Sequence, residues 1–208
     1  MESLSDSTKK TLELLANSGV AKDFYLAGGT GLALYLGHRY SYDLDFFSAK
    51  NFDESQLVQR LSSFNALRTA EFRLENQSEQ TINGVLDGVK ISFLGYRYPL
   101  LKPCQMVGGI LLADVLDIAC MKIDTISKRG AKRDFVDIYF ILKEVTPLPD
   151  FLKSFVQKYA SVNYNMVHIK KSLVYFEDAE ADAMPNMIKP VNWEGLKDFL
   201  REEVVKIG

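Results

Sequence analysis

The chain has 208 residues, of which 47% are hydrophobic, 25% are charged and 12% are aromatic, and its 25 basic and 27 acidic side chains leave a net charge of −2. This composition is typical of a globular protein, and the length suits one elaborated domain or two small domains that share a core. The near-neutral balance argues against a protein that coats nucleic acid through its bulk charge, although it leaves room for a local basic site.

The sequence also argues against export and against a membrane location. The first residues contain no basic segment followed by a long apolar run, so we expect no signal peptide. The most apolar stretch, residues 110–120, contains two aspartates and is far too short to cross a bilayer. Cys104 and Cys120 have neither metal-site spacing nor a disulfide-rich pattern, and we therefore expect a reduced, cytoplasmic protein.

In chain order, the first half alternates between helical and strand patterns. The sequence predicts a helix at 11–18 that ends at Gly19, a strand at 24–27, the first turns of a helix at 32–36, a strand at 43–47 and a helix at 54–64. Between residues 67 and 98 the pattern becomes that of strands. Asp87-Gly88 separates two alternating runs there and predicts a hairpin of residues 81–86 and 89–94.

After Pro99 and Pro103 the pattern becomes helical. An apolar stripe runs from Leu112 to Ile126, and Gly130 separates it from a second helix. Further helical segments follow, with an acidic loop before the last of them; the expected ranges are 132–143, 151–159, 164–176 and 193–204, and the acidic loop covers 177–182. The sequence therefore predicts a mixed α/β front half and a helical back half, with the break near residues 99–103.

A double glycine and a pair of aspartates form the first candidate site. Gly28-Gly29-Thr30 joins a strand to a helix, where backbone amides can face a phosphate and Thr30 can cap the helix or offer its hydroxyl. Asp43 and Asp45 lie two apart on a strand, so both carboxylates project from the same face. Carboxylates beside a core need a cation and suit Mg²⁺. Each feature alone is more often a tight turn or a solvated strand edge, and only their conjunction indicates a site.

Arg39 and Ser41 lie between these two parts of the first candidate site. Arg39 precedes the aspartate strand, where its guanidinium could reach a phosphate or pair with Asp43. An ordinary surface arginine is an equally good interpretation.

The second candidate site is a basic segment at residues 122–133. It carries five positive charges and one negative charge, a net of +4, from Lys122, Lys128, Arg129, Lys132, Arg133 and Asp124. Lys122 lies within the apolar stripe of its helix, and its ammonium suits a triphosphate. Arg133 and Asp137 are four residues apart and could simply pair on a helix face. A solvated basic turn remains the alternative for Lys128 and Lys132.

Together the two candidate sites resemble the AbiEii/AbiGii-type nucleotidyltransferases, the toxin halves of bacterial abortive-infection and toxin–antitoxin pairs. The resemblance rests on Gly28-Gly29-Thr30, on the segment from Arg39 through Ser41, Asp43 and Asp45 to Phe47, and on Lys122, Arg129, Arg133, Asp134 and Asp137. It implies an α+β nucleotidyltransferase fold, with a small mixed sheet and flanking helices at 1–100 and a helical domain at 101–208 that contributes to the same cleft.

The resemblance also implies an activity. A nucleoside triphosphate would donate a nucleotidyl group, with Mg²⁺, to an acceptor that is RNA, for which tRNA is one candidate, or protein. An antitoxin protein would be a partner. Asp43 and Asp45 would bind the metal, Lys122 would contact the triphosphate, and Asp134 or Asp137 would complete the catalytic set. The residues expected to bind the nucleotide are Gly28, Gly29, Thr30, Arg39, Ser41, Lys122, Arg129 and Arg133.

One position departs from the superfamily pattern. These enzymes commonly carry a third carboxylate on a later strand as general base, and the matching strand at 89–94 offers Ser92. A helix aspartate could replace the base, or chemistry at metal-bound water could suffice. Otherwise the protein binds nucleotide or a partner without efficient transfer. A phosphotransferase that acts on a small molecule is a further alternative.

Overall fold

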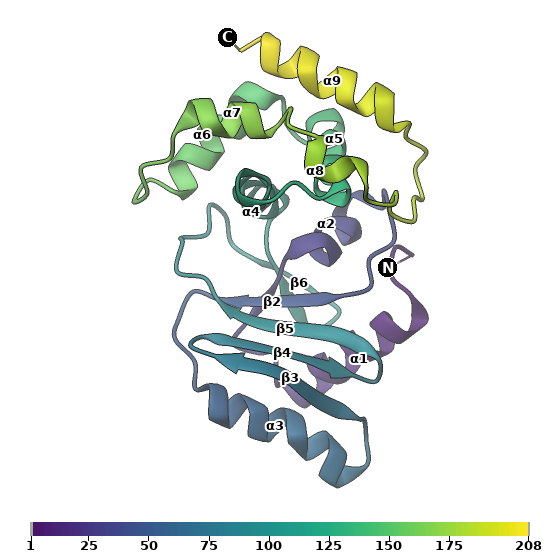
Figure 1. The fold of residues 1–208 in the computed structure, drawn as a ribbon. Helices are drawn as coiled ribbons and strands as arrows, with labels where there is room; N and C mark the ends of the chain where they lie inside the picture. The colour runs from purple at the N-terminus through teal and green to yellow at the C-terminus, as the bar shows by residue number, and fades with distance from the viewer. Residues whose placement is uncertain (1, 208) are drawn as a thin grey trace.

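The computed structural model describes residues 2–207 of the chain and shows one mixed sheet flanked by helices (Figure 1). The strands are β1 (Tyr25–Leu26), β2 (Leu44–Ser48), β3 (Phe72–Ser78), β4 (Thr81–Leu86), β5 (Val89–Gly95), β6 (Gln105–Val107) and β7 (Ile110–Leu112). The helices are α1 (Asp6–Ser18), α2 (Gly28–Leu36), α3 (Glu54–Leu67), α4 (Val115–Lys128), α5 (Lys132–Glu144), α6 (Leu148–Lys158), α7 (Met166–Ser172), α8 (Glu177–Glu180) and α9 (Trp193–Val205). The predicted α+β fold class is confirmed.

The strands form a single sheet in the order β3-β4-β5-β2-β1-β7-β6. Strand β2 runs parallel to β5, and β1 runs parallel to β7, whereas the other neighbours are antiparallel. The hairpin of β4 and β5 forms as predicted. Asp87 and Gly88 both take the positive φ angles, 49° and 79°, that a two-residue turn between twisted strands requires.

The structure departs from the expected helical pattern just after residue 100. Residues 105–112 form the hairpin of β6 and β7, and α4 begins only at Val115, so Leu112 belongs to a strand. Gly108 and Gly109 supply the turn with φ angles of 57° and 81°. Strands of three residues are too short to show alternation, and β7 exists because it pairs with β1. The sheet thus extends past residue 100, and the division into 1–100 and 101–208 stays a prediction.

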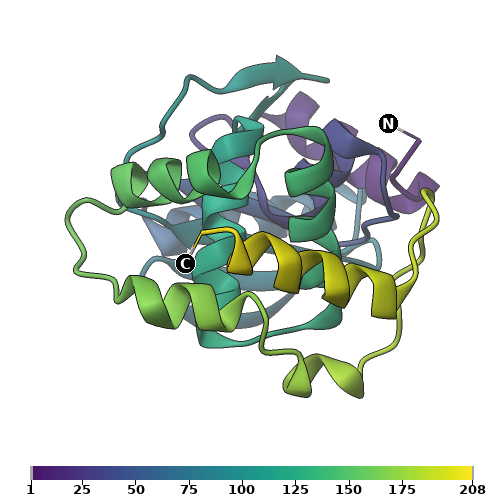
Figure 2. The same ribbon diagram turned by 90° about the horizontal axis from the view of Figure 1, so that it is seen from above.

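Two boundaries near the end of the chain also differ from the expectation. Helix α7 ends at Ser172 rather than at 176, and the expected acidic loop begins as the short helix α8. Helix α9 follows the predicted amphipathic pattern and begins after Asn192, whose side chain accepts a hydrogen bond from the backbone N–H of Gly195. Figure 1 and Figure 2 show α9, in yellow, at the top of the molecule, where it contacts α5.

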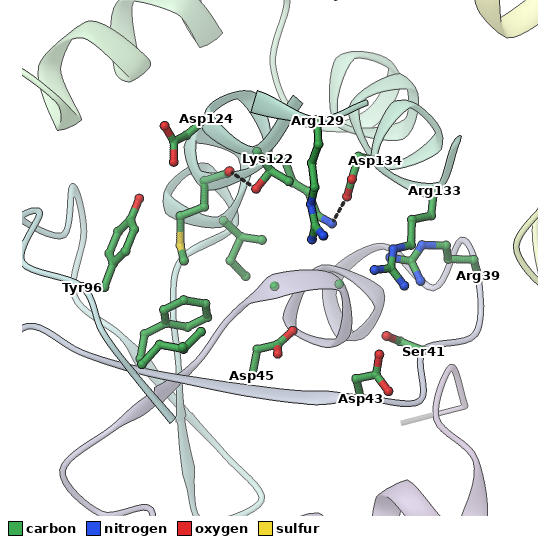
Figure 3. A pocket seen from close by; sticks show the side chains of 17 residues that line it. Arg39, Ser41, Asp43, Asp45, Tyr96, Lys122, Asp124, Arg129, Arg133 and Asp134 are labelled. Carbon is green, nitrogen blue, oxygen red and sulfur yellow. Dashed lines mark hydrogen bonds and ion pairs between the residues drawn. The ribbon is translucent and has the colours of Figure 1, made fainter. Parts of the chain in front are cut away.

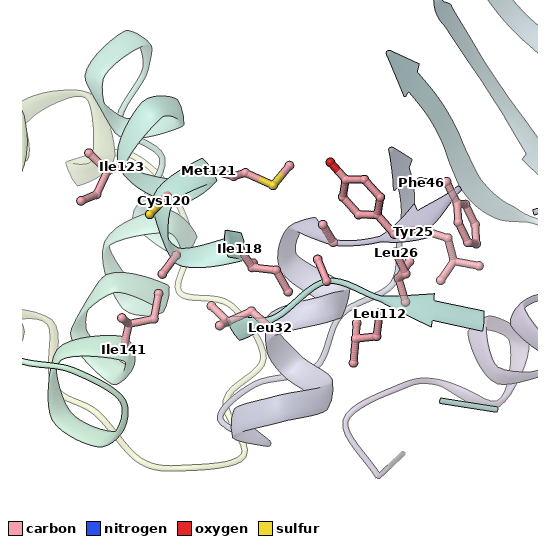
Figure 4. Packing of buried hydrophobic residues seen from close by; sticks show 14 of the residues in the cluster. Tyr25, Leu26, Leu32, Phe46, Leu112, Ile118, Cys120, Met121, Ile123 and Ile141 are labelled. Carbon is pink, nitrogen blue, oxygen red and sulfur yellow. The ribbon is translucent and has the colours of Figure 1, made fainter. Parts of the chain in front are cut away.

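One hydrophobic core joins the sheet to the C-terminal helices. Figure 1 places α2 between them, and Figure 4 shows Ile118 of α4 beside Leu32 of α2 and Leu112 of β7. The approach depends on Gly31, because a Cβ atom there would lie 2.9 Å from Cδ1 of Ile118. This close packing at Gly31 holds α4 against α2 and the sheet. It therefore also fixes the positions of the two walls of the cleft described below.

Candidate active site

A cavity of about 310 Å³ lies between strand β2 and helices α2, α4 and α5 (Figure 3). It brings together ten residues that the sequence singled out, from segments far apart in the chain: Gly28, Gly29, Arg39, Ser41, Asp43, Asp45, Lys122, Arg129, Arg133 and Asp134. Thr30 and Asp137 are not in its lining. The two motifs separated by about 80 residues in the sequence are therefore two walls of one cleft.

The sheet wall of the cleft carries the aspartate pair. Asp45 lies on β2 and Asp43 directly precedes the strand. Burial, and then the charge of Asp43, raises the pKa of Asp45, while Lys122, a hydrogen bond with Ser92 and Arg133 act in the opposite direction. Neither aspartate forms an ion pair with another residue in the range 2–207. Two neighbouring carboxylates without a cation are an arrangement that a divalent ion would stabilise.

Ser92 is the direct neighbour of Asp45 in the sheet. The parallel register of β2 and β5 pairs Asp45 with Ser92, and their side chains interact through a hydrogen bond. The third strand position that the sequence analysis identified therefore does face this site. In this chain it supplies a hydroxyl rather than a carboxylate.

The beginning of α2 closes the floor of the cleft. Gly28 has a φ angle of 62°, and a Cβ atom there would lie 2.7 Å from Oδ2 of Asp45. At Gly29 a Cβ atom would lie 2.6 Å from Nη2 of Arg39. The N-cap residue of α2 is Ala27, whose side chain cannot accept a hydrogen bond from the first backbone N–H groups of the helix. These N–H groups can therefore donate to a bound anion.

Thr30 has a different place from the one expected. It is buried within the first turn of α2, and Ala27 rather than Thr30 occupies the cap. Its hydroxyl is hydrogen-bonded to the Ser41 hydroxyl, at 2.8 Å, and to the carbonyl oxygen of Asp43. Thr30 therefore ties α2 to the aspartate segment, and its backbone amide is the group left for a phosphate.

Behind the cleft, Asp137 is the centre of a buried ion network. Arg39 donates two hydrogen bonds to its carboxylate, at 2.7 and 2.9 Å, and Nζ of Lys122 lies 2.7 Å from Oδ2. Although burial alone would raise it, the charges of Lys122 and Arg39 hold the pKa of Asp137 well below its usual range. The expected alternatives, Arg39 with Asp43 and Arg133 with Asp137, are not the pairs that form.

Lys122 and His38 complete this network. Lys122 also binds Oδ1 of Asp134 at 2.8 Å, and the two aspartates raise its pKa despite the opposing effect of burial. His38, which the sequence analysis did not select, is fully buried with Nε2 at 2.7 Å from Oδ1 of Asp137. A lone histidine gives no sequence signal for such a role, because its partner lies 99 residues away.

The helical wall of the cleft presents two free arginines. Arg129 follows the end of α4, and Arg133 lies in the first turn of α5. Both are exposed, and neither forms an ion pair with a residue that the structure describes. Figure 3 shows both side chains extending from the helices toward the side of the cleft that holds Asp43 and Asp45. Gly130 breaks the helix between them.

The neighbouring lysines of the basic segment have structural contacts. Lys132 is buried rather than solvated, and its ammonium donates hydrogen bonds to the carbonyl oxygens of Glu180 and Asp182, at 3.2 and 2.6 Å. Lys128 is exposed and binds Asp124 at 2.8 Å. The solvated-turn interpretation thus holds for Lys128 and is wrong for Lys132.

The end of the cleft beyond Asp45 is more apolar and was not expected from the sequence. Phe47, Leu94, Tyr96 and Met121 line it. The hydroxyl of Tyr96 is hydrogen-bonded to that of Tyr159, which fixes the ring. Residues 47 and 94 continue the alternation of strands that carry Asp45 and Ser92, which is the one signal that could have found them.

The residues present fit a magnesium site with few protein ligands. Within residues 2–207, no group of three or more His, Cys, Asp or Glu side chains could hold a metal ion. Asp43 and Asp45 would therefore supply the only carboxylates. Mg²⁺ suits such a site, because it commonly binds one or two carboxylates together with waters and phosphate oxygens.

Comparisons with known proteins agree with this geometry. Residues 11–106 match the family model described as nucleotidyl transferase AbiEii toxin, type IV toxin–antitoxin system. The chain is 38% identical over 209 residues to an uncharacterized protein of Aquifex aeolicus, which covers 98% of this chain and 97% of that protein.

Two solved structures show a similar fold. The crystal structure of JHP933 from Helicobacter pylori has a TM-score of 0.58 at 19% identity and covers 99% of this chain and 93% of that one. The nucleotidyltransferase toxin MenT4 from Mycobacterium tuberculosis has a TM-score of 0.56 at 14% identity, and the match covers 98% of this chain and 87% of that one.

Among residues 2–207, no helix has the length and apolar character needed to cross a bilayer.

Proposed function

The chain belongs to the AbiEii family of nucleotidyl transferase toxins, and we propose that it moves a nucleotidyl group from a magnesium-bound nucleoside triphosphate to an RNA acceptor. Attack of an acceptor hydroxyl on the α-phosphorus would form the new phosphodiester bond, and the bond to the β-phosphate would break to release pyrophosphate. Because the family is one of toxin–antitoxin systems, we also expect an antitoxin protein as partner.

The observation that carries this proposal is the pattern of free charge across the cleft. Asp43 and Asp45 lie opposite Arg129 and Arg133, and within residues 2–207 neither the two carboxylates nor the two arginines have an ion-pair partner. Direct ion pairs between the walls would have neutralised both sets. A metal–triphosphate complex has the complementary pattern, since its cation meets the aspartates and its phosphates meet the arginines.

The side chains of this cleft then have distinct tasks. Arg129 and Arg133 stabilise the charge that develops on the leaving pyrophosphate. The free amides at the start of α2 bind donor phosphates. Bound Mg²⁺ would polarise the α-phosphate and favour ionisation of the attacking hydroxyl.

The helix aspartates differ in what they can contribute. Asp137 is outside the cleft lining and fully engaged with Arg39, Lys122 and His38, so it positions these residues and does not accept the acceptor proton. Asp134 lines the cleft; its Oδ1 pairs with Lys122, and its buried Oδ2 has no hydrogen-bond partner among residues 2–207. Asp134 is therefore the helix carboxylate that could replace the missing strand base.

Transfer can be tested with each α-labelled nucleoside triphosphate, Mg²⁺ and total RNA, followed by a denaturing gel. We expect label in RNA with one triphosphate, pyrophosphate as co-product, and no label with Asp45→Ala or with chelator. Label on protein alone would contradict the RNA acceptor. Release of a nucleoside diphosphate instead of pyrophosphate would indicate a phosphotransferase.

Ser92 favours one second candidate, a module that binds nucleotide or a partner protein without transfer. Calorimetry with nucleotide and Mg²⁺, run beside the gel assay, separates the two functions. Binding without any labelled product would favour the module, whereas binding with product supports the enzyme.

A further inference from the structure

A second cavity, of about 530 Å³, opens beside the cleft. One wall is the C-terminal end of α4 with residues 126–130, and the other is α7 with residues 171–178. We call this cavity the α4–α7 groove. Arg129 lines both the groove and the cleft, so the two spaces meet at this side chain.

Basic side chains predominate among the charged residues that line the α4–α7 groove. Lys128, Arg129, His168 and Lys171 line it, against the single acidic residue Asp178. Arg129 and Lys171 form no ion pair with any residue between 2 and 207, and the Lys128 side chain is 65% exposed. A row of exposed cations that leads to an active site attracts a polyanion and guides it there.

The groove also offers an aromatic face. Tyr175 is 51% exposed, and its hydroxyl donates a hydrogen bond to Glu177 at 2.8 Å, which limits the motion of the ring. Exposed, fixed aromatic rings beside cations stack the bases of single-stranded nucleic acid. The two walls are held together by His168, whose ring Nε2 donates to the carbonyl oxygen of Ser127 at 2.9 Å. The groove is thus formed before any ligand binds.

A third cavity borders the cleft on its other side, and it is less suited to an anionic chain. It shares Arg39 and Arg133 with the cleft and contains Tyr40 and Tyr42. However, Arg39 is already bound through two nitrogens to Asp137. Arg133 alone remains for a phosphate there. The α4–α7 groove offers Arg129 and Lys171, which have no ion pair among residues 2–207, and Lys128, which is 65% exposed although it pairs with Asp124.

We propose that the α4–α7 groove binds the single-stranded end of the RNA acceptor, with its backbone on Lys128 and Lys171 and a base on Tyr175, and leads the terminal hydroxyl past Arg129 into the cleft. This inference rests on the proposed function, since it assigns the acceptor subsite of the same reaction. It concerns the substrate's path and not the donor site.

The test compares Lys171→Gln and Tyr175→Ala with the matched control Lys22→Gln. Lys22 is an exposed lysine between α1 and β1, and it is not among the residues that line the groove or the cleft. Two readouts are needed: the Kd of a fluorescent single-stranded RNA by anisotropy, and the KM of RNA and of the donor nucleotide in the transfer assay.

We expect Lys171→Gln to raise the Kd and the KM for RNA about fivefold and to lower the slope of log Kd against log salt by about 0.7. Tyr175→Ala should raise both constants about tenfold through lost stacking. The KM for the donor nucleotide should not change, and Lys22→Gln should behave as the parent protein.

The outcomes separate this proposal from the proposed function. Groove-dependent RNA binding without any transfer would support the groove and contradict the enzyme function. Transfer to RNA with unchanged Kd and KM in both groove variants would overturn the assignment of the groove as the RNA subsite. A protein partner would then be the alternative ligand of the groove. No measurable RNA binding by the parent protein would overturn the groove as well.

Discussion

Two pairs of aspartates lie in the cleft or directly behind it, and their electrostatic environments are opposite. Asp43 and Asp45 on the sheet side have no ion-pair partner among the described residues, and the pKa of Asp45 is raised by burial and by its neighbour. Asp134 and Asp137 on α5 are buried against Lys122, and Asp137 against Arg39 as well. The first pair is left open for a cation from outside, and the second is already neutralised by the chain.

The contrast explains how a site that contains unpaired carboxylates can belong to a stable fold. The paired aspartates fix Arg39 and Lys122, and through them they join α5 and α4 to the segment before β2. Residues that position a site gain stability from their interactions, whereas residues that bind a ligand keep unsatisfied charge until it arrives. The two pairs should therefore respond differently to the same isosteric change.

The largest effect is expected on activity from Asp45→Asn. The substitution removes one of two carboxylates that would hold Mg²⁺, and we expect a loss of kcat/KM of about a thousandfold or more. Stability should be equal to or above that of the parent, because a half-buried charge without a partner is removed. Steady-state transfer kinetics and thermal unfolding measure the two effects. Full activity of this variant would rule out the two-carboxylate mechanism.

Asp137→Asn should have the opposite signature. It leaves the buried Arg39 and Lys122 without most of their counter-charge, and we expect the free energy of unfolding to fall by about 3–5 kcal/mol. Urea unfolding followed by circular dichroism gives this value. A matched comparison is Asp150→Asn, which affects only an exposed pair with Lys153 and should change little. If Asp137→Asn were as stable as the parent, the buried network would not be a stabilising element.

The two variants should also show opposite trends with pH. The pKa of Asp137 is lower in the folded protein, so its stabilising effect is present above its unfolded value of about 4 and is lost as the pH falls below it. The deficit of Asp137→Asn should thus be steady from pH 5 to 8 and shrink below about pH 4. The pKa of Asp45 is raised, so its charge costs stability as the pH rises above about 4.

Melting temperatures of both variants and the parent, measured across this pH range, test the trends together. For Asp45→Asn, the difference from the parent should become more favourable as the pH rises. Parallel curves for the two variants would contradict the contrast between the aspartate pairs.

The smallest effect is expected from Ser92→Ala. Ser92 lies beside Asp45 and lowers the pKa of that carboxyl through a hydrogen bond. Its loss should reduce kcat/KM by less than about tenfold and shift the acidic limb of the pH–rate profile upward. A loss as large as that of Asp45→Asn would instead make Ser92 a catalytic residue.

Much of the fold could be predicted from local patterns. The turn Asp87-Gly88 defined its hairpin, and the amphipathic pattern defined α9, because both depend on neighbouring residues alone. Strands β6 and β7 could not be predicted, since three residues carry no periodicity and β7 is held by its pairing with β1. The burial of Lys132 likewise depends on carbonyl groups about 50 residues away.

For the site, the sequence by itself determined which residue types meet: glycines at a strand–helix turn, two aspartates on a strand and a basic segment. These signals can be recognised in the sequence because each depends on spacings of a few residues. Only the tertiary structure decided which charged side chains form ion pairs and which do not. It gave Asp137 to Arg39, Lys122 and His38, and it left Asp43 and Asp45 open to the cleft. That choice depends on distances between segments about 100 residues apart, which no local pattern contains.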